Sequence, residues 1–186
     1  MPFTRDHLPI VSSWFDDLET RRWLGGREWP EAILRQQEYF VSGQVFRGAV
    51  VLATVNRVLL DGDRPIALVT GEIYDRETRY AGDGPDGPRF ADAASVQRPQ
   101  AGVAVVVDPE RRKQGVGRAA IAAWMAHSNL DLAGSFVAGI EPENEGSQAL
   151  FASLGFRPAS VEPDWEGMLT YVCDRREDPA SVRVSG

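Results

Sequence analysis

An apolar run that leads through a glycine-rich turn into an alanine-rich segment constrains the fold of this chain most. Residues 102–107, GVAVVV, carry no polar side chain, which is typical of a strand buried on both faces. The next segment, RKQGVGR (112–118), places two glycines and three cations ahead of RAAIAAWMAH (118–127), whose composition favours a helix. The sequence therefore predicts a buried strand, a tight turn and a helix in immediate succession.

Helical and extended patterns flank this unit. Apolar residues recur at helical spacing from Leu8 to about Phe40, and Gly25, Gly26 and Pro30 are expected to divide this region into two helices. Several later segments are rich in β-branched residues or helix formers. We expect a hairpin from FRGAVVLATVNRVLL (46–60) and IALVTGEIY (66–74), a strand SFVAGIEP (135–142), a helix SQALFASLGF (147–156) and a last strand MLTYVC (168–173).

The chain is predicted to form one domain over residues 1–173, because 186 residues with 43% apolar side chains can bury one core. Within this domain, residues 1–43 would form a helical wall on the substrate side. Residues 75–100 combine glycine, proline and charge without periodicity, which predicts a long mobile loop. The polar residues 174–186 are expected to be a flexible tail.

The charge balance excludes some classes of partner. The chain has 20 Lys and Arg against 27 Asp and Glu, a net charge of −7, which argues against nucleic-acid and membrane surfaces and favours a cationic partner. Its single cysteine, Cys173, excludes an internal disulfide and a CxxC metal site. Without a secretory signal or a membrane-length apolar run, we expect a cytoplasmic protein with no metal.

The glycine turn has the composition of an anion-binding site. Free amides at a helix start converge where the helix dipole is positive, and Gly115 and Gly117 let the main chain approach a ligand. Four cations, Arg111, Arg112, Lys113 and Arg118, can neutralise phosphate. The alternative is that the glycines only relieve crowding and the cations are solvated. Neither GxxxxGK(S/T) nor a dinucleotide fingerprint with its acidic ribose ligand fits well.

Two motifs in order resemble a known family. VDPERRKQGVGRA (107–119) resembles motif A of the GNAT N-acetyltransferase superfamily, (R/Q)-x-x-G-x-(G/A), through Arg112, Gly115 and Gly117. NEGSQALFASLGF (144–156) resembles the second signature of that family through Asn144, Leu150, Gly155 and Phe156. The resemblance covers about residues 44–173. It implies an α/β fold with a mixed, mostly antiparallel sheet and helices on both faces, in a family where homodimers are common.

The resemblance also implies where acetyl-CoA would bind. In the family this co-substrate lies in a V-shaped gap between the fourth and fifth strands, here GVAVVVD and SFVAGIE. Its pantetheine arm would pair with the fourth strand and its pyrophosphate with the turn amides. The implied residues are Val105, Val106, Val107, Arg112, Lys113, Gln114, Gly115, Val116, Gly117, Arg118, Asn144, Ser147 and Phe151. An alternative role for Asn144 is that of a helix N-cap.

The reaction implied is direct attack of a neutral amine on the thioester, with a main-chain N–H of the fourth strand stabilising the oxyanion. Candidate bases are Glu72 and Glu141 at the ends of two strands, although each would equally suit contact with water or an arginine. The tyrosine acid of the family aligns with Phe151, which cannot donate a proton. Tyr171, Ser147 or water are the alternatives.

The amine would meet the N-terminal helices, where carboxylates and aromatic rings suit a cation, although tryptophans at helical spacing are also typical of a core. The residues concerned are Trp14, Phe15, Asp16, Asp17, Trp23 and Trp29. The preferred function is acetyl transfer from acetyl-CoA to a primary amine of a small molecule or a protein N-terminus. The alternative is a non-catalytic acyl-CoA-binding module.

Overall fold

The computed structural model describes residues 1–94 and 97–175. Its N-terminal part holds three α-helices where two helices were predicted. These are α1 (Leu8–Ser13), α2 (Leu18–Leu24) and α3 (Glu28–Glu38). The missed break precedes α2, where the Asp17 carboxylate accepts the Thr20 N–H at 2.8 Å and caps the helix. Gly25, at φ +86°, ends α2. Pro30 does not divide the region, because it lies in the first turn of α3, where its missing N–H has no acceptor to lose.

The predicted long strands are each interrupted at the same level of the sheet. The segment 46–60 contains β2 (Ala49–Thr54) and β3 (Arg57–Asp61), and the segment 66–74 lies within β4 (Arg64–Thr70) and β5 (Glu72–Tyr74). The buried run divides likewise into β8 (Gln100–Gly102) and β9 (Ala104–Val107). The predicted hairpin exists as β3 and β4, which pair antiparallel across their turn.

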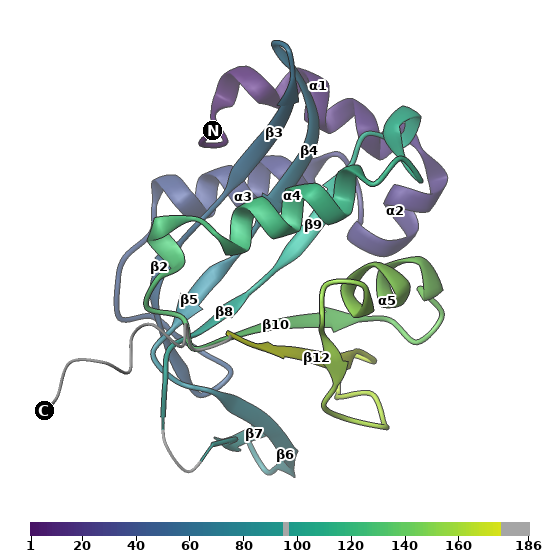
Figure 1. The fold of residues 1–186 in the computed structure, drawn as a ribbon. Coiled ribbons are helices and arrows are strands. Elements are labelled where there is room, and N and C mark those ends of the chain that lie inside the picture. Colours follow the sequence, from purple (N-terminus) through teal and green to yellow (C-terminus); the bar gives the residue numbers. More distant parts are fainter. Residues whose placement is uncertain (95–96, 176–186) are drawn as a thin grey trace, which may run out of the picture.

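These interruptions divide the interrupted strands between two sheets (Figure 1), and a separate two-stranded hairpin forms a third. One has the order β1-β2-β5-β8-β10-β12-β11, the other β3-β4-β9. The remaining members are β1 (Val45–Phe46), β10 (Ser135–Ile140), β11 (Arg157–Pro158) and β12 (Leu169–Asp174). Among the described strands, β8 and β10 form the one parallel pair. The predicted mixed, mostly antiparallel α/β sheet is confirmed.

Helices cover both faces of the smaller sheet, as Figure 1 shows. Leu68 of β4 points to the core that Val11, Phe15 and Leu34 form under α1 and α3. Its neighbour Val69 points to the opposite core, together with Ile121 and Trp124 of α4 (Val116–Met125) and Phe151 of α5 (Glu145–Ala152). This alternation is expected of a strand buried on both faces.

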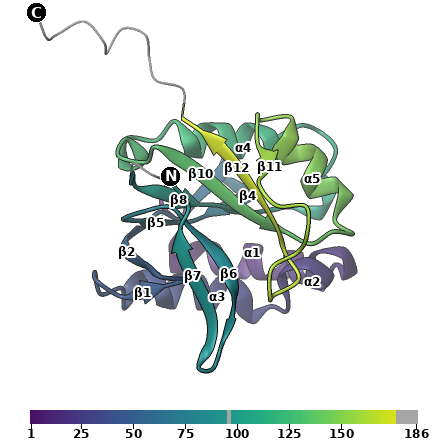
Figure 2. The same ribbon diagram turned by 90° about the horizontal axis from the view of Figure 1, so that it is seen from below.

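The prediction of a long loop over residues 75–100 was wrong for the middle of this range. Residues 78–92 form a hairpin of β6 (Thr78–Gly84) and β7 (Gly87–Asp92), which projects from the body in Figure 2. The two strands stay largely exposed, so their sequence carries little apolar alternation. The signal that was overlooked is the GPDG turn at residues 84–87. Residues 95 and 96 lie outside the described part.

The C-terminal boundary lies slightly later than predicted. Strand β12 extends to Asp174, and the Arg175 guanidinium binds the Leu130 carbonyl oxygen and the Asp131 carboxylate. The rest of the predicted tail, residues 176–186, lies outside the described residues. Across the part that the structure describes, no helix combines the length and the apolar character needed to cross a bilayer.

Candidate active site

A V-shaped gap opens where β9 leaves β10. The parallel pairing of β8 with β10 ends at Val137, whose carbonyl oxygen accepts the Val103 N–H at 2.9 Å. Beyond this point β9 pairs with β4, while β10 pairs with β12, so the two strands diverge (Figure 1). The gap leaves one edge of β9 without a strand partner among the described residues.

The free edge of β9 offers main-chain groups at alternate residues. The Asp108 N–H donates to the Ile66 carbonyl oxygen of β4 at 3.0 Å, and successive residues of a strand direct their N–H and C=O groups to opposite sides. Val106 therefore bonds toward β4, and Val105 and Val107 face the gap. Of the three predicted valines, two therefore direct their main-chain groups into the gap.

The turn after β9 exposes the first amides of α4. Lys113 and Gly115 both have positive φ, +59° and +80°, a pattern that turns successive N–H groups inward. Gly115 is the N-cap of α4 and has no side chain to cap it, and the first bonded amide of the helix is that of Ala119, which donates to the Gly115 carbonyl oxygen at 3.0 Å. The amides of residues 116–118 thus lack intrahelical acceptors, as in anion sites.

Gly115 and Gly117 serve different purposes. A Cβ on Gly115 would meet nothing within 4 Å, so its positive φ is the constraint. A Cβ on Gly117 would lie 3.2 Å from Leu150 Cδ2 and 3.3 Å from Val107 Cγ2, so this glycine lets α4 pack closely on β9 and α5. The crowding explanation therefore holds for Gly117, in addition to any role in binding.

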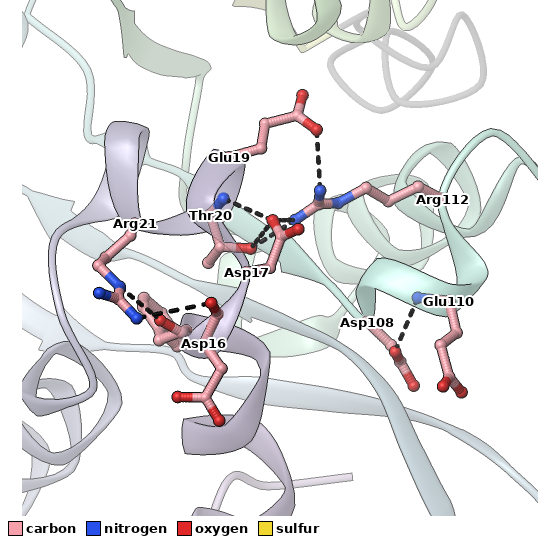
Figure 3. A network of polar contacts seen from close by, with 9 residues as sticks. Asp16, Asp17, Glu19, Thr20, Arg21, Asp108, Glu110 and Arg112 are labelled. Carbon is pink, nitrogen blue, oxygen red and sulfur yellow. Dashed lines mark hydrogen bonds and ion pairs between the residues drawn. The ribbon is translucent and has the colours of Figure 1, made fainter.

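Two of the four predicted phosphate-binding cations are held by acidic side chains. Arg112 donates to Asp17 at 2.8 Å and to Glu19 at 2.9 Å, and it also contacts the Thr20 hydroxyl (Figure 3). Arg111 donates to Asp61 at 2.7 Å. Lys113 and Arg118 are exposed and form no ion pair with the described residues, so they are the cations available to a ligand at the turn.

A cavity of about 630 Å³ lies at the gap. It is lined by Val103, which precedes β9, by Ala104 of β9 and by Val137 and Gly139 of β10. Ile33 and Gln36 of α3 also line it. The β6–β7 hairpin and the segment 159–168 contribute further lining side chains. A group held in the gap would therefore reach the cavity directly.

Glu72 lies in this cavity, and neutral donors fix its carboxylate. The Tyr74 hydroxyl donates to Oε2 at 2.6 Å, and the Gln36 amide donates to Oε1. Burial, followed by the nearby charge of Glu72, raises the pKa of Tyr74 well above its ordinary value, so this phenol stays protonated at physiological pH. Gly102 makes room for the ring, because a Cβ there would lie 3.2 Å from Tyr74 Cε2.

The other two predicted catalytic residues do not line the cavity. Tyr171 is 8% exposed and donates to Gln148 Oε1 at 3.2 Å, in the core beneath α5. Glu141 follows β10 and is half-buried. The structure thus brings Glu72 to the cavity and leaves Glu141 and Tyr171 outside it.

The residues of the second motif hold α5 in place. Asn144 Oδ1 accepts the Ser147 N–H at 3.1 Å, which confirms the N-cap role that was considered for Asn144. Phe151 is 4% exposed and packs edge-to-face on Phe156, with ring centroids 5.0 Å apart. A tyrosine at position 151 would have to bury its hydroxyl in this core.

The acidic and aromatic N-terminal residues considered for the amine lie away from the cavity, and the core packing weighed as the alternative is found for Trp14 and Phe15. Trp14 and Phe15 are buried, and Arg27 and Arg112 pair with the carboxylates of Asp16 and Asp17. None of the six predicted residues lines the described cavity. The aromatic side chains that do line the cavity lie on strands and on one loop, and none of them was predicted as a site residue. These side chains are Phe46, Tyr74, Tyr80, Phe90 and Trp165.

Comparison with known proteins identifies the family. The family model for the acetyltransferase (GNAT) domain matches residues 1–157. The chain belongs to the GNAT acetyltransferase family. The uncharacterized N-acetyltransferase YfmK of Bacillus subtilis (strain 168) is 26% identical over 165 residues, which cover 89% of this chain and 88% of YfmK.

Solved structures show the same GNAT fold. An acetyltransferase from Thermus thermophilus superimposes with a TM-score of 0.62 at 17% identity, over 94% of each chain. An aminoglycoside acetyltransferase, determined in complex with coenzyme A, gives a TM-score of 0.62 at 14% identity, over 94% of this chain and 93% of that one. At this level of identity the likeness concerns the fold.

Proposed function

We propose that this GNAT protein transfers an acetyl group from acetyl-CoA to a primary amine of a small molecule or a protein N-terminus. The observation that carries the proposal is the junction of three features: a free strand edge, an uncapped helix start and a cavity that contains Glu72. The strand edge and the helix start suit binding of the co-substrate, and the carboxylate in the cavity suits removal of a proton from the amine.

The chain's own groups fit the co-substrate. The main chain of Val105 and Val107 has the spacing of an edge that accepts an extended ligand, and the amides of residues 116–118 suit a diphosphate. Lys113 and Arg118 add positive charge beside those amides. When bound, acetyl-CoA supplies an acetyl group activated as a thioester.

Glu72 is the proposed general base. Its carboxylate lies in the cavity that Val103 and Ala104 also line, and its two oxygens are oriented by Tyr74 and Gln36. An amine arrives as an ammonium ion and must lose a proton before it can attack the thioester. A carboxylate positioned beside the ammonium group can accept that proton. Glu141 and Tyr171 lie outside the cavity and are not assigned a role in this step.

The test combines cofactor binding with base removal. We expect calorimetry to detect coenzyme A binding, and acetyl-CoA with an amine panel to release free thiol. Glu72→Gln should lower kcat/KM by about 10²–10⁴-fold, the usual contribution of a general base, without loss of coenzyme A affinity. Glu162→Gln, which alters another carboxylate in the cavity lining, is the matched control and should stay near wild type.

Three outcomes decide the proposal. A protein that binds no coenzyme A would refute it. Binding without turnover on any amine would favour the acyl-CoA-binding module instead. Activity that survives Glu72→Gln but disappears in Glu141→Gln would move the base to the other carboxylate.

A further inference from the structure

One wall of the cavity is aromatic. Tyr80 and Phe90 of the hairpin and Trp165 of the segment 159–168 contact one another, with ring centroids 6.4 Å apart for Tyr80 and Phe90, 5.3 Å for Tyr80 and Trp165, and 5.0 Å for Phe90 and Trp165. All three line the cavity. This aromatic wall, Tyr80–Phe90–Trp165, offers ring surface to an acceptor.

One ring of this wall, Trp165, already holds a cation of the chain itself. The guanidinium carbon of Arg47 lies 4.7 Å from the Trp165 ring centroid and 5.2 Å from that of Phe46. The same guanidinium pairs with the Glu166 carboxylate and lies 3.9 Å from Asp164. Arg47 therefore neutralises two acidic side chains of the lining, Asp164 and Glu166.

Glu72 differs from these carboxylates because uncharged groups alone bond to it in the described structure. Its partners are the Tyr74 hydroxyl and the Gln36 amide, neither of which carries a charge. The negative charge next to the gap is therefore not cancelled by an ion pair. Of the other charged side chains in the lining, Arg76 pairs with Asp75 at 2.7 Å, and Arg79 and Glu162 are exposed, opposite in charge and without an ion pair to the described residues. Glu72 is thus the half-buried carboxylate of the lining that lacks an ion pair, and a second ammonium group would find no such partner there.

From these charges and surfaces we infer that the acceptor is a monoamine with an aromatic body. Its single ammonium group pairs with Glu72, and its ring packs against the aromatic wall. The inference rests on the proposed function and specifies its substrate class. The same chemistry occurs in a free arylalkylamine and in a peptide whose N-terminal residue is aromatic, so the experiment needs an arm for each.

The experiment compares amines that differ in one property. With acetyl-CoA present, thiol release is measured for 2-phenylethylamine against propylamine, for the peptides Phe-Gly-Gly and Ser-Gly-Gly, and for the polycations spermidine and kanamycin. We expect the aromatic member of one pair to exceed its partner in kcat/KM by about 10-fold or more, the usual contribution of a buried apolar group. Both polycations should be poorer substrates than the better aromatic amine.

Variants link the preference to the wall. Trp165→Ala should raise the KM of the preferred aromatic amine about 10-fold and reduce its advantage over the aliphatic partner, with little change in kcat. Val161→Ala is the matched control, because this side chain belongs to the same segment, is 98% exposed and does not line the cavity. Calorimetric titration of the amine into the coenzyme A-loaded protein gives a readout of binding without turnover.

The possible results separate this inference from the proposed function. Equal or higher kcat/KM for spermidine or kanamycin would overturn the inference while leaving the acetyltransferase proposal intact. So would a Trp165→Ala variant that affects aromatic and aliphatic amines alike. Absence of thiol release with every amine, in a protein that binds coenzyme A, would contradict the proposed function itself.

Discussion

Two residues of one motif illustrate what the sequence can and cannot predict at the residue scale. The motif correctly indicated a tight turn, because glycine at residues 115 and 117 is a local signal. It did not indicate that Gly117 is fixed by Val107 and Leu150, since these contacts depend on how α4 packs. The pairing of Arg112 with Asp17 was equally out of reach, because 95 residues separate the two in the chain.

Substitution of these glycines should distinguish the need for a positive φ at Gly115 from the need for space at Gly117. Gly117→Ala should lower the free energy of unfolding by about 1–3 kcal/mol, the usual cost of overpacking, because its Cβ would approach Leu150 and Val107. Gly115→Asn should cost less, since asparagine tolerates positive φ and open space surrounds the site. Urea denaturation without ligand measures both. A Gly117→Ala protein as stable as wild type would show that the helix can move away freely.

At the scale of elements, Arg112 connects α2 to the glycine turn, and Figure 3 shows it between Asp17, Glu19 and Thr20. We expect this connection to hold the turn amides ready for coenzyme A. Arg112→Ala should weaken coenzyme A binding by roughly 3–10-fold, the range expected for loss of a partly exposed ion-pair network. Calorimetry provides the measurement.

The partner variant distinguishes an indirect role from a direct one. Asp17→Asn removes the charge but keeps a good N-cap acceptor for Thr20. If Arg112 acts through α2, Asp17→Asn should weaken binding to a similar degree, and the double variant should be no worse than either single one. Undiminished or tighter binding by Asp17→Asn would mean that the freed guanidinium contacts the ligand itself.

The elements themselves were predicted unevenly, for a physical reason. The strand, turn and helix over residues 102–127 were anticipated because each has a strong local pattern. The interruptions near Val55, Gly71 and Val103 were not, because they arise where neighbouring strands change partners. A Cβ on Gly71 would lie 2.1 Å from the Gly102 carbonyl oxygen, a constraint that exists only after the strands have paired.

At the scale of the whole molecule, acid should destabilise the fold through particular carboxyl groups. Hydrogen bonding from Arg76, with the Val50 N–H as a further donor, lowers the pKa of Asp75 below its ordinary value, and the Thr20 N–H together with Arg112 lowers the pKa of Asp17. A lowered native pKa stabilises the fold above the unfolded value, near 4, and this stability is lost as the pH falls through the native pKa.

We therefore expect the free energy of unfolding to decline as the pH is lowered from about 6 to about 3. Asp75→Asn should be less stable than wild type at the higher pH and should decline less steeply, because one of the titrating groups is gone. Urea midpoints across this range measure both slopes. Parallel slopes for the two proteins would show that Asp75 does not contribute to the acid sensitivity.

The unpaired side of β9 has a consequence for how such chains diverge. Recognition there would be made by peptide groups, which every amino acid except proline supplies alike, so nearly any side chain that suits the two cores can occupy these positions. Selection would then conserve the backbone conformation of this strand more strongly than its amino-acid sequence. Structures that share the fold over 94% of this chain at 14–17% identity agree with this expectation.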